Sequence, residues 1–303
     1  MPTHTLTDRF DSRTLAALEG LDFKARYVME GFLSGLHHSP IHGYSVEFSD
    51  YRNYQPGDDL RHLDWRLYAR TDRLCIKQYE LDTNARFYVV CDTSASMAYR
   101  GSRAWESKLG CARILAAALT WFMLKQNDAA GLVAFGESTD FPRFVRPAQR
   151  STQFGTMLRE LDALQPSRNA CLANLLTHTV RLIHRRSVVL LFSDLLEPSA
   201  ELEHCLKQLR FQGHEVLLFQ VLDPDELDFP FTNSQLFEDL ETGARRQISP
   251  VLAREKYLQR FNAFLDDHRK LCQGLEIPIC LIRTDEDLCQ ALTMFLAQRS
   301  RFK

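Results

Sequence analysis

The sequence lacks a long hydrophobic run and a strong excess of either charge. Its longest apolar stretch, residues 114–124, is interrupted by Thr120 and has about half the length that a membrane span requires. The formal net charge of −2 gives no support to a role at nucleic acids or membrane surfaces. The first residues carry no apolar signal region. We therefore predict a cytoplasmic protein without a membrane span and without nucleic acid as a partner.

Paired cysteines are also missing. The eight cysteines are scattered, and no two are separated by only two residues. This spacing excludes a disulfide framework and a structural zinc site as the basis of the fold. Because several of them stand in apolar segments, we predict reduced thiols in the core.

Common enzyme signatures are absent as well. The chain has no G-x-x-x-x-G-K-[ST] phosphate loop, no G-x-G-x-x-G after a strand and no G-x-S-x-G turn. Nothing therefore indicates nucleotide hydrolysis, dinucleotide binding or the chemistry of a serine hydrolase. We predict that the protein is not an enzyme.

From about residue 87 onward, the chain alternates between apolar strand-like segments and helical patterns. The expected strands are residues 87–91, 131–135, 188–192, 215–222 and 277–282. The expected helices are residues 108–126, 152–164, 172–184, 200–211, 252–272 and 286–299. Strands separated by helices pair in parallel through right-handed crossovers. Residues 86–303 are therefore predicted to form an α/β domain, a doubly wound, mostly parallel sheet with helices on both faces.

The first 85 residues have a different pattern and are predicted to form an N-terminal α+β arm packed on this domain. Residues 14–36 carry a helical apolar pattern, while 42–54 and 74–79 read as extended around a short helix at 59–70. Residues 223–249 contain Pro224, Pro230 and Gly243 and are expected to form a loop or a small edge insertion.

Short oxygen-bearing side chains follow two of the predicted strands. Asp92, Ser94 and Ser96 come directly after strand 87–91, and Asp194 follows strand 188–192. Taken alone, the first three could simply bond to backbone amides in a turn. If the two strands are neighbours where the winding reverses, however, all four side chains meet at the carboxyl end of the sheet. Such ligands suit Mg²⁺, with Mn²⁺ as a substitute, so Asp92, Ser94, Ser96 and Asp194 are the predicted metal site.

The run Asp92-Thr93-Ser94-Ala95-Ser96 after a buried strand, with Ser193-Asp194 after a later one, resembles a von Willebrand factor type A domain. This resemblance implies a Rossmann-like fold with a metal-ion-dependent adhesion site. In such a site, a carboxylate from a partner protein completes the coordination of Mg²⁺.

The N-terminal arm points to one particular family that contains such a domain. The runs GYSVEFSDYR at 43–52 and YQPGDDLRHLDWR at 54–66 resemble the signature of the bacterial family called "domain of unknown function fifty-eight". The resemblance implies a MoxR-type AAA+ ATPase and a client protein as partners. The chain would then be a chaperone-like adaptor in protein maturation or complex assembly. The charges of the 50–73 block are interpreted as structural ion pairs, with a catalytic acid/base pair as the alternative.

One loop departs from the adhesion-site pattern. Such sites take a threonine from a loop that here reads Pro-Ser-Arg-Asn-Ala-Cys-Leu over residues 166–172, with Ala170 or Cys171 at the expected position. The site therefore lacks one hydroxyl ligand, unless water, Ser167 or Asn169 replaces it. Two alternatives stay open: a metal-dependent hydrolase or phosphatase using Asp92 and Asp194, or a degenerate site in which the arm makes the contacts.

Overall fold

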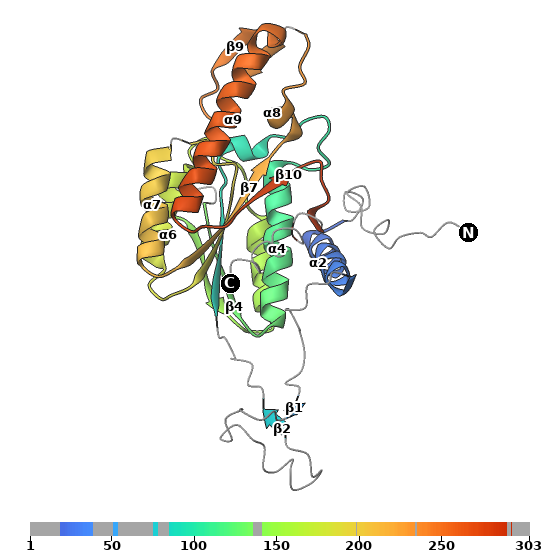
Figure 1. The fold of residues 1–303 in the computed structure, drawn as a ribbon, viewed down its shortest axis with the longest axis vertical. Coiled ribbons are helices and arrows are strands. Elements are labelled where there is room, and N and C mark those ends of the chain that lie inside the picture. Colours follow the sequence, from blue (N-terminus) through green and yellow to red (C-terminus); the bar gives the residue numbers. More distant parts are fainter. Residues whose placement is uncertain are drawn as a thin grey trace, which may run out of the picture. The chain divides into compact units, whose positions relative to one another are not determined.

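The structure is a computed structural model that describes residues 19–38, 51–53, 75–77, 85–135, 141–197, 199–233, 235–289 and 292 (Figure 1). The chain divides into two compact units, one formed by Met1–Ser39 with Ala85–Lys303 and the other by Pro40–Asn84. In the second unit, β1 (Tyr51–Asn53) pairs antiparallel with β2 (Cys75–Lys77), which confirms the extended segments at these residues. The predicted short helix at 59–70 lies outside the described residues, and the arm boundary near residue 85 stays a prediction.

A six-stranded sheet with the order β10-β7-β6-β3-β4-β5 organises the first unit. Its strands are β3 (Arg86–Cys91), β4 (Ala129–Ala134), β5 (Arg143–Ala148), β6 (Val188–Ser193), β7 (Glu215–Leu222) and β10 (Ile279–Arg283). All neighbours pair in parallel except β5, which runs antiparallel to β4. From the other edge, this is the 3-2-1-4-5-6 order of a Rossmann fold. The predicted doubly wound, mostly parallel sheet is confirmed.

Helices cover both faces of the sheet. In Figure 1, α4 (Lys108–Lys125) and α2 (Leu21–His38) lie on one side of it, and α6 (Leu172–Leu182) and α7 (Ser199–Phe211) lie on the other. Two further helices are α5 (Gln153–Asp162) and α9 (Pro250–Gly274). The helices expected between residues 108 and 272 are confirmed. Most of the one expected at 286–299 lies outside the described residues, although Leu288, Cys289 and Leu292 are helical.

Strand β5 was not predicted. It contains Arg143, Arg146 and Pro147, and its side chains are only half-buried or exposed. As an antiparallel edge strand it needs neither a continuous apolar run nor a full set of backbone donors, so it resembles a loop in sequence.

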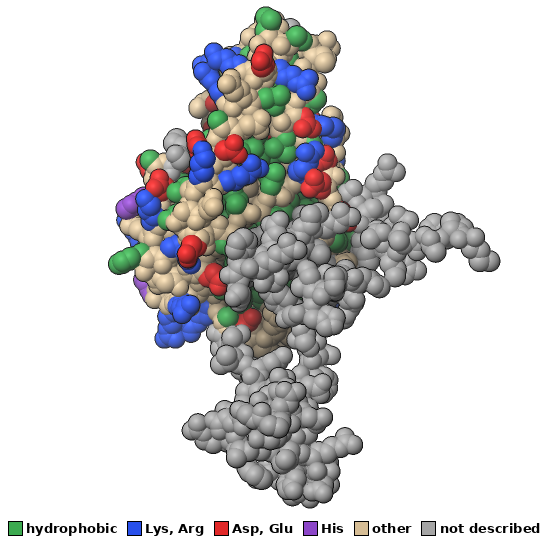
Figure 2. Space-filling view, viewed as in Figure 1, with side chains coloured by type: hydrophobic (Ala, Val, Ile, Leu, Met, Phe, Trp, Pro, Cys, Tyr) green, Lys and Arg blue, Asp and Glu red, His purple; other side chains and the backbone are tan. Residues whose placement is uncertain are grey.

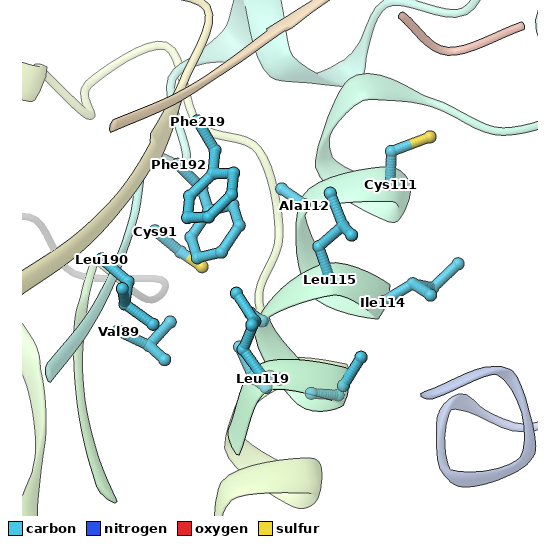
Figure 3. Close-up of a cluster of buried hydrophobic side chains, with 14 of the residues drawn as sticks. Val89, Cys91, Cys111, Ala112, Ile114, Leu115, Leu119, Leu190, Phe192 and Phe219 are labelled. Atoms are coloured by element: carbon cyan, nitrogen blue, oxygen red, sulfur yellow. The ribbon is translucent and has the colours of Figure 1, made fainter. Parts of the chain in front are cut away.

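The main core lies between the sheet and α4. Figure 3 shows Ala112, Leu115 and Leu119 of α4 facing side chains of β3, β6 and β7, among them the stacked rings of Phe192 and Phe219. Because α4 is buried nearly all round, its opposite side packs against α2, whose Ala25, Val28 and Met29 are fully buried. A second core on the other face joins the sheet to α6 and α7. Five of the described cysteines are buried, as expected for the core: Cys91, Cys111, Cys205, Cys272 and Cys289.

Residues 223–249 form an insertion with structure of its own. A short helix, α8 (Pro224–Asp228), precedes a hairpin of β8 (Gln235–Glu238) and β9 (Arg245–Ile248). This hairpin makes a two-stranded sheet of its own, and it is inserted in the chain between β7 and the edge strand β10. Figure 2 shows Lys, Arg and hydrophobic side chains on the surface around β9 and the start of α9, where Val251 and Leu252 are exposed.

Candidate functional site

The end of the sheet beneath the insertion brings the predicted site residues together. β3 and β6 are parallel neighbours, and the Asp92 backbone N–H donates to the Phe192 carbonyl at 2.9 Å. The Ser193 hydroxyl donates to Asp92 Oδ2 at 2.6 Å, which joins the two loops directly. Since β4 lies on the far side of β3, this is the point where the winding direction reverses.

Asp92 is a buried carboxylate with few donors. Its side chain accepts hydrogen bonds from the Ser94 N–H at 2.9 Å and from Ser193, and the residue is 2% exposed. Burial, and then the nearby charge of Asp194, raise the pKa of Asp92 to about 7. The Ser94 and Ser96 hydroxyl oxygens lie 3.2 Å apart beside it, at the start of the 3₁₀ turn η3 (Ala95–Ala98). Two hydroxyls and a carboxylate thus gather at the end of β3.

A lysine that the sequence did not indicate lies at the same place. Lys108, in the first turn of α4, is fully buried, and its ammonium contacts Asp194 Oδ2 at 2.7 Å and Glu226 Oε1 at 2.6 Å. Burial opposes the charged form, but the two carboxylates outweigh it and raise the pKa of Lys108. Asp194 therefore already has a cationic partner. The available signal was the position of Lys108 in the first turn of a helix that is apolar on most faces.

The backbone after Asp194 is held in a strained turn. Leu195 has a φ of 61°, in the left-handed region that a leucine rarely adopts. Its N–H donates to Ser193 Oγ at 2.9 Å, and its side chain is fully buried in the second core. The Leu196 N–H donates to Asp194 Oδ1 at 3.2 Å. Strain of this kind is common at functional sites, and here the Asp194 carboxylate beside it is oriented by the Leu196 N–H and by Lys108.

The 166–172 loop, where a threonine was expected, runs beside η3. The Ser167 N–H donates to the Thr93 carbonyl at 2.8 Å, and Ser94 and Ser167 form an isolated parallel bridge. The Ser167 hydroxyl accepts from the Asn169 N–H, while Ala170 is buried. The loop is therefore in place, but its expected position carries no hydroxyl.

A cavity of about 370 Å³ opens over the site. Its lining is strongly acidic and consists of Ser96, Tyr99, Asp194, Leu196, Glu197, Glu226, Glu238, Asp239, Leu240 and Glu241. Glu241, from the turn of the β8–β9 hairpin, accepts a hydrogen bond from the Ser96 N–H at 2.7 Å. Glu226 and Glu241 were not predicted at the site. Both come from residues 223–249, whereas the predicted site used only the loops that follow strands 87–91 and 188–192.

A second group of carboxylates lies at the ends of β7 and β10. Asp223 accepts from the Gly101 N–H at 2.8 Å, the Thr284 hydroxyl at 3.0 Å and the Asp225 N–H at 2.9 Å. It also forms a capping box with Glu226 at the start of α8. Arg103 contacts Asp225 at 3.4 Å. These contacts join three distant segments of the chain.

The donor set at β3 and β6 fits a divalent cation. Oxygen ligands of this type suit Mg²⁺, and among the described residues no cationic side chain lies within ion-pair distance of Asp92. No three His, Cys, Asp or Glu side chains in the described ranges form a metal cluster of their own. A site here would therefore depend on the serines. Within the part of the chain that the structure describes, no helix has the length and apolarity to cross a membrane.

Comparisons with known proteins agree with the sequence resemblance. The family model described as "Protein of unknown function DUF58" matches residues 50–270. The uncharacterized protein Rv1480 of Mycobacterium tuberculosis is 30% identical over 309 residues, covering 99% of this chain and 94% of its own. The protein YeaD of Bacillus subtilis is 31% identical over 125 residues, covering 41% of this chain and 28% of its own.

Solved structures align at lower similarity. The hypothetical protein BatB of Bacteroides thetaiotaomicron aligns with a TM-score of 0.43 at 14% identity, covering 72% of this chain and 99% of its own. The SpRpn10 von Willebrand factor A domain aligns with a TM-score of 0.37 at 12% identity, covering 69% and 93%. The length of the family match and the near-complete coverage of Rv1480 decide the assignment: the chain belongs to the DUF58 family.

Proposed function

We propose that this protein is a non-enzymatic interaction module that docks a partner at the end of the sheet formed by β3 and β6. The observation that carries the proposal is Asp92, a buried carboxylate without a cationic partner among the described residues, beside the Ser94 and Ser96 hydroxyls. Buried charges are normally paired or bound to a metal. The site is thus best explained as an adhesion-type site for a divalent cation.

Asp92, Ser94, Ser96 and Asp194 would hold the cation, with Mg²⁺ as the expected ion and Mn²⁺ as its substitute. Lys108 would keep Asp194 in place by holding one of its oxygens. When bound, the ion would supply the positive charge that attracts a carboxylate of the partner. Because the cavity over the site is lined mainly by acidic side chains, a partner carboxylate would be repelled without that ion.

The proposed setting is the cytoplasm, with a MoxR-type AAA+ ATPase as a partner that supplies energy. The chain would be a chaperone-like adaptor in the maturation or assembly of a client protein. The ground for this setting is what the resemblance of the runs at 43–52 and 54–66 to the DUF58 family implies. The hydrolase alternative gains no support from the described residues, because the side chains that the structure adds to the site are engaged in structural contacts.

Calorimetric titration with Mg²⁺ and Mn²⁺ tests the metal step. We expect wild type to bind one ion and Asp92→Asn to bind at least about tenfold more weakly, since one anionic ligand is lost. Asp162→Asn, at the exposed end of α5, is the matched control and should bind as wild type does. Equal absence of binding in wild type and Asp92→Asn would refute the metal site.

Affinity capture from native cells, followed by mass spectrometry, tests the partner. We expect an AAA+ ATPase to be recovered with wild type in Mg²⁺ and to be depleted by EDTA or by Asp92→Asn. Recovery that is insensitive to both would show that the partner binds elsewhere on the chain.

A further inference from the structure

The β8–β9 hairpin places one of the chain's own carboxylates at the docking site. Glu241 Oε1 lies 2.7 Å from the backbone nitrogen of Ser96, a residue 145 positions earlier in the chain. The preceding Ser94 side chain makes no capping bond to this turn, so Glu241 supplies the acceptor for the Ser96 N–H. A carboxylate from another molecule that approached Ser96 would meet this contact first.

The turn of the hairpin is built to present Glu241. Asp239 Oδ1 accepts from the N–H groups of Glu241 at 2.9 Å and Thr242 at 3.2 Å. Gly243 has a φ of +71°, and its N–H donates to the Asp239 carbonyl at 2.7 Å. These bonds fix the turn locally, without help from the site.

Two kinds of contact hold the hairpin. Phe237 of β8 stacks on Phe229 with 5.9 Å between ring centroids, and Phe229 packs on Tyr257 of α9. From Glu238 into the turn, the contacts are polar: the Glu241 bond and an exposed ion pair between Arg168 and Glu238 at 3.2 Å. Exposed ion pairs contribute little, and the turn brings acidic side chains toward Asp194. The turn can therefore be displaced while Phe237 stays packed.

We propose that Glu241 is an internal ligand that closes the docking site and that an acidic side chain of the partner must displace it. This inference rests on the proposed function, because it takes the same site and the same class of ligand. It adds that the free protein is autoinhibited and that the hairpin is the part that opens.

The contact itself is tested by amide exchange at Ser96, measured by nuclear magnetic resonance on the whole chain. We expect Glu241→Ala and Glu241→Gln to speed exchange of the Ser96 amide at least about tenfold, because the N–H loses its charged acceptor. Glu255→Gln, on the exposed surface of α9, is the control and should leave the rate unchanged. Equal rates in wild type and Glu241→Ala would overturn the proposal.

Competition is tested with acetyl-glutamyl-methylamide as the acidic probe and acetyl-glutaminyl-methylamide as its neutral control, both in saturating Mg²⁺. Glu241→Ala should bind the acidic probe about tenfold more tightly than wild type does, and it should not bind the neutral probe. Equal affinity of the two proteins, or no binding by either, would overturn the proposal. Mn²⁺ titration of both wild type and Glu241→Ala separates the two claims. Absence of metal binding in both proteins refutes the adhesion site, whereas the amide-exchange result judges the Glu241 contact independently.

Discussion

Two groups of buried carboxylates lie at the same end of the sheet, and they are built differently. Asp223, after β7, accepts hydrogen bonds from two distant residues, Gly101 and Thr284, and from the Asp225 N–H in its own turn, and Arg103 balances the charge of Asp225. Asp92, after β3, accepts two hydrogen bonds and has Asp194 close by, while Lys108 is already shared by Asp194 and Glu226. The first group joins parts of the fold. The second leaves Asp92 buried and, among the described residues, without a counter-charge, which raises its pKa to about 7, and a bound cation would favour its charged form.

The largest expected effect tests how much the second group depends on its one lysine. Lys108→Met should lower the free energy of unfolding by about 3–5 kcal/mol, because it leaves Asp194 and Glu226 without their buried counter-charge. Urea denaturation measures the change. Lys125→Met, at the exposed end of the same helix, should cost less than about 1 kcal/mol. Similar losses for the two variants would show that Lys108 contributes as an ordinary helix residue.

An intermediate effect is expected at the first group. A Cβ at Gly101 would overlap the carboxylates of Asp223 and Asp225, so Gly101→Ala should destabilise by about 1–3 kcal/mol. Gly155, inside α5, has open space around it, and Gly155→Ala should stabilise by about 0.5–1 kcal/mol. Thermal unfolding of the two variants should shift in opposite directions. If Gly101→Ala left the midpoint of thermal unfolding unchanged, the carboxylates of the Asp223 group would be able to rearrange without cost.

The smallest expected effect separates the two groups by size. Asp223→Asn should cost about 1.5 kcal/mol in metal-free buffer, because an amide nitrogen would replace an acceptor that faces donors. Asp92→Asn should cost less there, because the pKa of Asp92 is raised to about 7 and its carboxyl is already partly protonated near neutral pH. Urea denaturation of both variants in EDTA, near neutral pH, makes the comparison. Equal destabilisation would show that Asp92 also has a structural role.

Much of the fold could be predicted because its central strands are continuous apolar runs. Segments such as Val188–Ser193 and Glu215–Leu222 have no other stable place than the interior of a parallel sheet. The edge strand β5 and the hairpin could not be predicted, because both are rich in arginine or other polar residues and bury little. Their strand character comes from pairing partners, not from their own composition.

The proximity of Asp92 and Asp194 could be predicted, because residues at the carboxyl ends of neighbouring parallel strands lie together where the winding reverses. This prediction needs only the order of the strands. Lys108 and Glu241 could not be found in that way. Lys108 arrives from the first turn of a helix, and Glu241 from a hairpin turn 145 residues away from Ser96. Side chains that reach a site from elements packed over it depend on tertiary structure, so local sequence gives little sign of them.

The left-handed turn at Leu195 has a consequence for how the site responds to partial unfolding. A glycine there would remove a strain of about 1–2 kcal/mol, but it would forfeit a fully buried leucine, which contributes about 2–5 kcal/mol. The turn is therefore held by hydrophobic packing and not by the intrinsic preference of its residue. Any loosening of the core around α6 and α7, by heat or by mutation, should disturb the Leu195 turn first and leave Asp194 held by Lys108.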